Sequence, residues 1–259
     1  MLETCFIKGN TMIYDYNDAN RHPRDSRIVF EPLSHRYIID GTLECESVTT
    51  VVGNCFAKFD ADYWAQRKAT PECPAEKWKA IWEEKGRIAR DEGTVLHARI
   101  ERHYLGYEPE PAALTDPAFV QFMRFAEHNE LKPFRTEWPV FMESCRIAGT
   151  LDFLAYDGKK FEIYDWKRST KVVDAAGRPI TDCYGRYGCA PVASVPDTTF
   201  HHYALQQSLY RHILETEYGI SVAACRLGVF HPKMADFHVV EVPYLAEEVK
   251  ALLAVRRHP

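Results

Sequence analysis

The sequence predicts an α/β fold built around a mixed β-sheet, and three observations support this prediction. In the second half of the chain, the hydrophobic periodicity indicates the order helix, three strands, helix, strand. Asp157-Gly158 separates two of these strands and is a favoured pair for a two-residue hairpin turn. A chain of 259 residues is also long enough to bury one sizeable core around such a sheet.

The N-terminal part predicts a β-hairpin followed by a short helix. Residues 27–41, RIVFEPLSHRYIIDG, alternate between apolar and polar side chains, with a turn near Pro32 to His35. Residues 60–69, DADYWAQRKA, suit a short helix because Asp60 can accept hydrogen bonds from the first free backbone N–H groups.

Two further helices are expected in succession. Residues 74–93 predict a helix that the final glycine terminates, and Thr94 then suits the N-cap of a separate helix that ends at Gly106. We therefore expect an N-terminal hairpin and helical extension, residues 1–92, packed on a core formed by residues 93–259.

The core begins with a helix over residues 116–131, which Asp116 caps and Pro117 opens. A Gly-, Pro- and Ser-rich loop of about thirty residues follows the third strand, which is long for a simple crossover. The remaining expected elements are strands over 134–143, 147–156 and 160–167, a helix over 200–219, strands over 225–232 and 236–243, and a terminal helix over 246–255.

Two aspartates and a lysine occupy the adjacent strands of the predicted hairpin. If the turn comprises residues 157–158, Asp152 lies diagonal to Asp165; if it comprises residues 158–159, the two lie directly opposite. In both registers the two carboxylates share one face with Lys167, because side chains repeat every second residue. Carboxylates so placed are roughly 5–8 Å apart, a spacing at which they can hold one divalent cation such as Mg²⁺.

Two helices carry further polar pairs. His97 and Glu101 are four residues apart on one helix face, and Gln206 and Tyr210 have the same spacing on a later helix. Each pattern alone also fits an ordinary structural role. The acid and lysine can form a surface ion pair, the histidine can be a satisfied boundary residue, and the tyrosine ring can lie in the core.

Taken in order, these signals form a longer pattern: Gly-Thr-x-x-His-x-x-Ile-Glu, Gly-Thr-x-Asp, Asp-x-Lys and Gln-x-x-x-Tyr. This series resembles the RecB-like branch of the PD-(D/E)XK nuclease superfamily, which includes phage-type exonucleases. The resemblance spans about Gly93 to Val229 and implies a restriction-endonuclease-like core. Leu151 stands where the name of the superfamily expects proline, a departure that is common in this branch.

The resemblance implies a role for each strand residue. Asp152 would be the shared metal ligand, Asp165 the second carboxylate, and the backbone carbonyl of Trp166 a third ligand. Lys167 would orient or activate the attacking water and offset charge on the phosphate. The implied cofactor is Mg²⁺, with Mn²⁺ as a substitute.

The helix residues receive supporting roles from the same resemblance. His97 matches a metal-binding histidine, and Glu101 is an additional candidate ligand. Gln206 and Tyr210 match a motif that supports the site and contacts the nucleic-acid strand. Arg168 and Lys171 follow the Asp-x-Lys motif closely, so we expect them to contact the strand as well.

Several features are missing from the sequence. There is no Gly-x-x-x-x-Gly-Lys-Ser/Thr loop, which argues against a nucleotide cofactor. The eight cysteines include no Cys-x-x-Cys pair, which argues against a zinc ribbon. The resemblance implies one early and three late cysteines for an iron–sulfur cluster, and Cys225 alone follows the Gln-x-x-x-Tyr motif, so no cluster is expected. With no apolar run of roughly 18 residues and no secretory leader pattern, we expect a cytoplasmic protein that does not bind membranes.

We therefore expect a Mg²⁺-dependent deoxyribonuclease. The leading hypothesis is a phage-derived exonuclease that acts on linear DNA in recombination or repair. A structure-specific endonuclease or nickase is the alternative within the class. A nucleic-acid-binding protein with a vestigial site and a metallohydrolase of small phosphate esters are alternatives outside it. DNA is the expected partner; recombination or helicase proteins and a second copy of the chain are further candidates.

Overall fold

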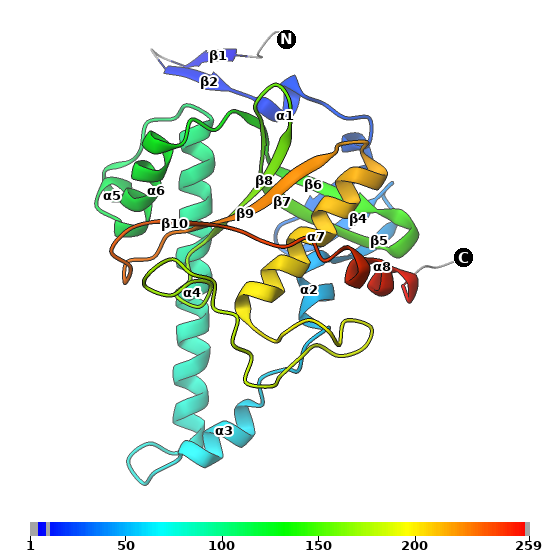
Figure 1. The fold of residues 1–259 in the computed structure, drawn as a ribbon. Coiled ribbons are helices and arrows are strands. Elements are labelled where there is room, and N and C mark those ends of the chain that lie inside the picture. Colours follow the sequence, from blue (N-terminus) through cyan, green and yellow to red (C-terminus); the bar gives the residue numbers. More distant parts are fainter. Residues whose placement is uncertain (1–4, 9–10, 257–259) are drawn as a thin grey trace.

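The computed structural model describes residues 5–8 and 11–256 of the chain (Figure 1). It confirms the predicted α/β class, with an open mixed sheet of eight strands and helices on both of its faces. Within the described ranges, no helix combines the length and the apolar character that crossing a bilayer requires.

The order of strands in the sheet is β10-β9-β8-β7-β5-β4-β3, and β6 pairs with β7 off this path, whereas β1 and β2 form a separate hairpin. The strands are β1 (Cys5–Lys8), β2 (Thr11–Tyr14), β3 (Ile28–Glu31), β4 (Arg36–Ile39), β5 (Leu43–Ser47), β6 (Pro133–Met142), β7 (Ile147–Tyr156), β8 (Phe161–Lys167), β9 (Val222–Val229) and β10 (His238–Glu241). The helices are α1 (Tyr16–Ala19), α2 (Val48–Gly53), α3 (Ala61–Lys68), α4 (Ala75–Tyr104), α5 (Pro111–Leu114), α6 (Pro117–His128), α7 (Thr199–Glu217) and α8 (Ala246–Ala254).

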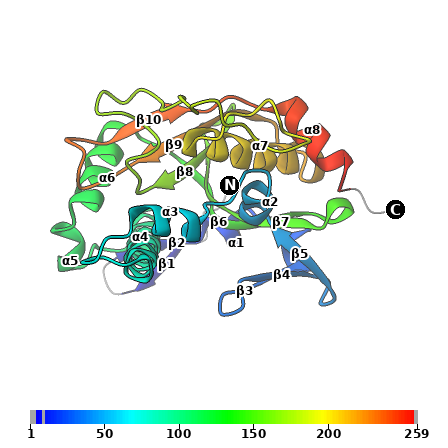
Figure 2. The same ribbon diagram turned by 90° about the horizontal axis from the view of Figure 1, so that it is seen from below.

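The two faces of the sheet are covered by different helices. One hydrophobic cluster joins the strands to α2, α7 and α8, and a second joins them to the C-terminal end of α4, to α5 and to α6. In Figure 2, α4 is seen end-on and lies well apart from α7. The order α6, β6, β7, β8, α7, β9 along the chain is the expected order of helix, three strands, helix, strand.

Most local predictions hold. The hairpin β3–β4 turns between Glu31 and Arg36, as expected, and β7 has the predicted bounds. Asp60 accepts a hydrogen bond from the backbone N of Tyr63 and begins α3. The long segment between β8 and α7 contains no helix or longer strand, also as expected.

The prediction of two separate helices over residues 74–106 is wrong, because α4 runs without a break from Ala75 to Tyr104. Gly93 and Thr94 both lie in its interior, and the Thr94 hydroxyl donates to the carbonyl of Arg90, one turn back, instead of capping a new helix. An interior glycine costs about 1 kcal/mol, which the burial of Leu96 and Ile100 in the next turn can offset. The expected boundary between residues 92 and 93 therefore falls inside a helix.

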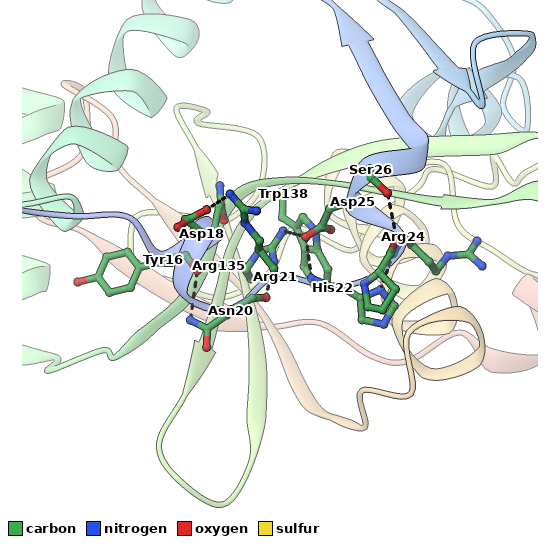
Figure 3. A network of polar contacts seen from close by, with 12 residues as sticks. Tyr16, Asp18, Asn20, Arg21, His22, Arg24, Asp25, Ser26, Arg135 and Trp138 are labelled. Carbon is green, nitrogen blue, oxygen red and sulfur yellow. Dashed lines mark hydrogen bonds and ion pairs between the residues drawn. The ribbon is translucent and has the colours of Figure 1, made fainter. Parts of the chain in front are cut away.

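The segment before β3 is anchored to β6 by a buried ion pair. The guanidinium of Arg135, whose residue is only 3% exposed, donates to Asp25 Oδ2 at 2.8 Å. The other Asp25 oxygen accepts from Trp138 Nε1 at 2.8 Å, and the backbone N of His22 also donates to Asp25 (Figure 3). Asp25 thereby joins a loop near the N-terminus to strand β6, more than a hundred residues away.

Candidate metal centre at a split in the sheet

The sheet divides along one edge of β7. On that edge β7 pairs with β5 only at Ile147 and Ala148, and with β8 only from Phe153 to Tyr156. Residues 149–152 lie between these two contacts, and on this edge the described sheet pairs no strand with them, whereas β6 pairs with residues 149–151 on the opposite edge. A split of this kind leaves room for side chains from other elements to reach the strand backbone.

Tyrosine side chains contact the Gly-Thr pair of β7 at the split, which explains the glycine. A Cβ atom on Gly149 would lie 2.5 Å from the hydroxyl oxygen of the buried Tyr210, so only glycine leaves that ring enough space. The hydroxyl of Tyr37 lies 3.0 Å from the Thr150 hydroxyl, within hydrogen-bond distance.

Three carboxylates lie side by side across β6, β7 and β8. The β7–β8 pairs, extended by one residue, place Asp152 opposite Asp165, which is the second of the two registers considered from the sequence. Beyond this pair, the Asp152 side chain replaces the backbone as the hydrogen-bond partner of β8: the backbone N of Trp166 donates to Asp152 Oδ2 at 2.8 Å. On the other side of β7, the pairs before and after it place Glu137 level with Asp152.

Glu137 sits in an unusual backbone conformation. Its φ of 44° is left-handed, which costs a residue other than glycine about 1–3 kcal/mol unless its surroundings impose it. The amide of Asn17 holds the preceding residue in place. Its Oδ1 accepts from the backbone N of Thr136 at 3.2 Å, and its Nδ2 donates to the carbonyl of the same residue at 2.7 Å. Asn17 thus takes the place of a neighbouring strand at the outer edge of β6.

His97, Glu137 and Asp152 form a group that can hold a metal ion. Each offers one ligand atom, and these atoms all lie within 4.8 Å of one another. His97 Nε2 donates to the carbonyl of Trp166 at 2.7 Å, which leaves Nδ1, 3.5 Å from Asp152 Oδ2, free to act as a ligand. Carboxylate oxygens suit Mg²⁺ and Mn²⁺, and an imidazole nitrogen suits transition metals. The donor set therefore fits a divalent cation.

The protonation of the carboxyl groups supports this reading. Burial, followed by the neighbouring charge of Asp152, raises the pKa of Glu137 to about 9. Burial also raises the pKa of Asp165 to about 6, although the ammonium of Lys167 opposes the rise. The nearby positive charge does not balance these closely spaced carboxyl groups. A bound divalent cation would compensate their negative charge and favour their ionised forms.

Lys167 and Gln206 contact Asp165 from two sides. The Lys167 ammonium lies 2.5 Å from Asp165 Oδ2 and 4.5 Å from the centre of the Tyr203 ring. Burial alone would lower the pKa of Lys167, but the carboxylates of Asp165 and Asp152 outweigh it and raise the pKa, so that the side chain stays charged. Gln206 Nε2 donates to Asp165 Oδ1 at 3.3 Å.

The structure thus brings most residues predicted from the sequence to one place: His97, Asp152, Asp165, Trp166, Lys167, Gln206 and Tyr210. The Trp166 carbonyl, predicted as a ligand, accepts the hydrogen bond from His97 Nε2 in this arrangement. Glu101 stands apart from the group of possible ligands and lines a pocket of about 450 Å³ together with Asn17 and Thr136, where burial raises the pKa of its carboxyl group.

The two basic residues after the motif lie elsewhere. Arg168 is paired with Glu92 at 2.5 Å. Lys171 is exposed and lines a different pocket, formed by the loop after β8 and the beginning of α7. Among the described residues, neither has a hydrogen bond or ion pair with the carboxylates of the candidate centre.

Sequence reasoning missed Glu137, Tyr203 and Asn17. Glu137 did carry a signal, because it is a lone acid in the otherwise largely apolar strand segment TEWPVFM. The argument that drew attention to Asp152 and Asp165, that charge inside a covered sheet needs a partner, applies to it equally.

Comparison with known proteins adds little to these observations. No protein-family model and no curated protein matches the chain. Among solved structures, it is similar to one described as the crystal structure of SSO0001, with 13% sequence identity over 83% of this chain and 77% of that chain, and with a TM-score of 0.29. A likeness at this level supports no conclusion about activity.

Proposed function

We propose that this chain is a divalent-metal-dependent deoxyribonuclease with a restriction-endonuclease-like core of the PD-(D/E)XK type. The observation that carries the proposal is the convergence of Asp152, Asp165 and Lys167 with His97 at the split in the sheet. These residues come from the motifs that resemble the RecB-like branch, and exonuclease action on linear DNA is proposed from that resemblance alone.

Each residue has a chemical task in this proposal. His97, Glu137 and Asp152 would hold the cation, Mg²⁺ or Mn²⁺, with Asp165 beside them. When bound, the ion neutralises phosphate charge and lowers the pKa of a bound water. The raised pKa of Lys167 keeps its side chain charged, so in the resting site it is not a base. Its ammonium instead offsets the negative charge of the scissile phosphate.

Three side chains keep this lysine in position. Asp165 binds the ammonium directly, and Gln206 holds the other oxygen of the same carboxylate. The Tyr203 ring lies against the ammonium as well. The site therefore orients a cation towards the place where a phosphate would lie, and a preorganised charge of this kind is worth about 10²–10³ in rate.

The test is cleavage of end-labelled linear DNA, beside a covalently closed circle, in Mg²⁺ and in Mn²⁺. We expect metal-dependent loss of the linear DNA, reduced at least about 100-fold in Lys167→Ala. Lys159→Ala is the matched control, because Lys159 is an exposed lysine at the turn of the same hairpin. It should retain full activity.

The other outcomes are equally informative. Cutting of the circle would favour an endonuclease or a nickase. A tight metal-dependent complex with DNA but no cleavage by the folded protein would favour a vestigial site. Turnover of a nitrophenyl phosphodiester without turnover of DNA would replace the nuclease proposal with a small-molecule phosphodiesterase.

A further inference from the structure

Residues 57–95 form a projection, here called the arm, that has almost no core of its own. This stretch is described throughout and comprises α3 and the first two-thirds of α4, and Ala65 is the one residue in it that is buried. The buried residues of α4, Leu96 and Ile100, begin only where the arm ends. Figure 1 shows α3 and this part of α4 extending beyond the sheet.

Five aromatic side chains gather on the arm. Phe59, Tyr63 and Trp64 are 64%, 49% and 42% exposed. The Phe59 and Trp82 ring centres lie 5.3 Å apart, as do those of Tyr63 and Trp64, and Trp78 lies 5.9 Å from Trp82. Large exposed rings in one place are unusual on a free surface and mark a binding site.

Cationic side chains lie among these rings. The Arg67 guanidinium donates to the Tyr63 hydroxyl at 2.9 Å and lies 6.0 Å from the centre of that ring. The Lys68 ammonium lies 5.3 Å from the Trp78 ring. Rings that can stack on bases, with cations beside them that can contact phosphates, are the combination by which proteins hold single-stranded nucleic acid.

The charge of the arm favours unpaired bases over a duplex. Its eight basic and eight acidic residues balance, and several are neutralised within the arm, for example Lys79 by Asp62 and Arg87 by Glu84 and Asp91. Binding to duplex DNA depends on a surplus of basic residues that neutralise phosphates. The stacking of a base on an aromatic ring contributes about 1–3 kcal/mol and does not itself depend on such a surplus, but it requires a base whose face is free.

We propose that the arm is a docking surface for the single-stranded part of the substrate whose scissile phosphate lies at the metal centre. The inference deepens the proposed nuclease function and rests on it. Trp82 and Trp78 precede His97 by 15 and 19 residues on one continuous helix, which is about 22 and 28 Å at 1.5 Å per residue. At about 3.4 Å per nucleotide, the rise of one strand in B-form geometry, this corresponds to roughly seven or eight nucleotides.

The test combines substrate length with removal of the rings. The variant Phe59→Ser/Tyr63→Ser/Trp64→Ser should fold normally, because all three side chains are exposed. For a single-stranded 15-mer its KM should rise by about tenfold to a hundredfold, with kcat unchanged. For a 4-mer, too short to reach the arm, KM should not change. Leu33→Ser, which removes a fully exposed apolar side chain from the β3–β4 turn, is the matched control.

A binding measurement separates failure of this inference from failure of the nuclease proposal. Fluorescence anisotropy with the labelled 15-mer in EDTA needs no turnover, and the triple variant should bind at least tenfold more weakly than wild type. This result would support the arm proposal even if no DNA were cleaved. Equal binding by wild type and variant, or an equal effect on the 4-mer, would overturn it and leave a protein partner as the explanation of the rings.

Discussion

Binding of a divalent cation at the candidate centre should release about one proton near pH 7.5, and Glu137 should supply it. The pKa of this carboxyl is raised to about 9 by burial and then by Asp152, with Glu101 and Asp165 adding to the rise and Lys167 opposing it. At pH 7.5 it is therefore almost fully protonated. A carboxyl group must ionise to bind a metal, so the proton leaves when the ion arrives.

The size of the release depends on pH in a way that the structure determines. With a pKa of about 6, Asp165 is half protonated at pH 6 and almost fully ionised at pH 7.5. If both carboxylates are ionised in the metal complex, the release should be about 1.5 protons at pH 6 and about 1 at pH 7.5. Above pH 9 it should fall towards zero.

Calorimetric titration with Mn²⁺ in two buffers of different ionisation enthalpy measures this release directly. Glu137→Gln has nearly the same shape and no proton to lose, so its release at pH 7.5 should fall close to zero, while about half a proton should remain at pH 6. Glu127→Gln, which changes an exposed acid on α6, should behave as wild type. Undiminished release in Glu137→Gln at pH 7.5 would refute the reasoning.

The same raised pKa predicts how stability depends on pH without metal. Between pH 4.5 and about 9 the unfolded chain ionises Glu137 while the folded chain keeps it protonated, so the unfolded state holds fewer protons. The free energy of unfolding must then decrease as pH rises through this window. Urea unfolding in EDTA at pH 5, 7 and 9 should show this decrease, and Glu137→Gln should show less of it. Added metal should restore stability most strongly at high pH.

Three further predictions concern side chains that shape the site and its support. Gly149→Ala should lower the free energy of unfolding by about 1–3 kcal/mol, because its Cβ would lie 2.5 Å from the Tyr210 hydroxyl. Urea denaturation measures this, and Tyr210→Phe in the same chain should recover part of the loss. Asp25→Ala should cost about 3 kcal/mol, because it leaves the buried Arg135 cation without its carboxylate; thermal unfolding that matches wild type would contradict this. Asn17→Ala should cost about 1–2 kcal/mol by freeing the edge of β6 and should weaken Mn²⁺ binding in the same calorimetric assay, whereas unchanged affinity would show that Glu137 needs no such support.

Elements set by local patterns could be predicted from the sequence, and the exception is informative. The caps at Asp60 and Asp116 depend on a few neighbouring residues, and both were predicted correctly. Gly93-Thr94 also looked like an end followed by a cap. Its outcome was decided by Leu96 and Ile100, whose burial on the sheet favours continuing the helix over ending it. The residues next to Gly93 in the sequence do not indicate this tertiary packing, so the continuation of the helix could not be predicted from them.

The residues of the candidate site also differ in whether a local sequence pattern could predict them. Asp152 and Asp165 are thirteen residues apart across one hairpin, so two registers covered the alternatives and the structure has one of them. Glu137 depends on a left-handed residue inside a strand, which no residue type in its neighbourhood signals. Its support comes from Asn17, about 120 residues earlier in the chain, and single-sequence patterns carry no information on a contact of that range.

The continuity of α4 also determines how this helix should open. A helix in water is costly to nucleate and cheap to extend, and the turn that contains Leu96 and Ile100 is the part that the core holds in place. The outer turns therefore persist as an extension of that turn, supported by α3 and by the ion pair between Glu92 and Arg168. Amide hydrogen exchange along α4 should accelerate gradually from Leu96 towards Ala75, as fraying from one end, and should not divide into two cooperative blocks at Gly93.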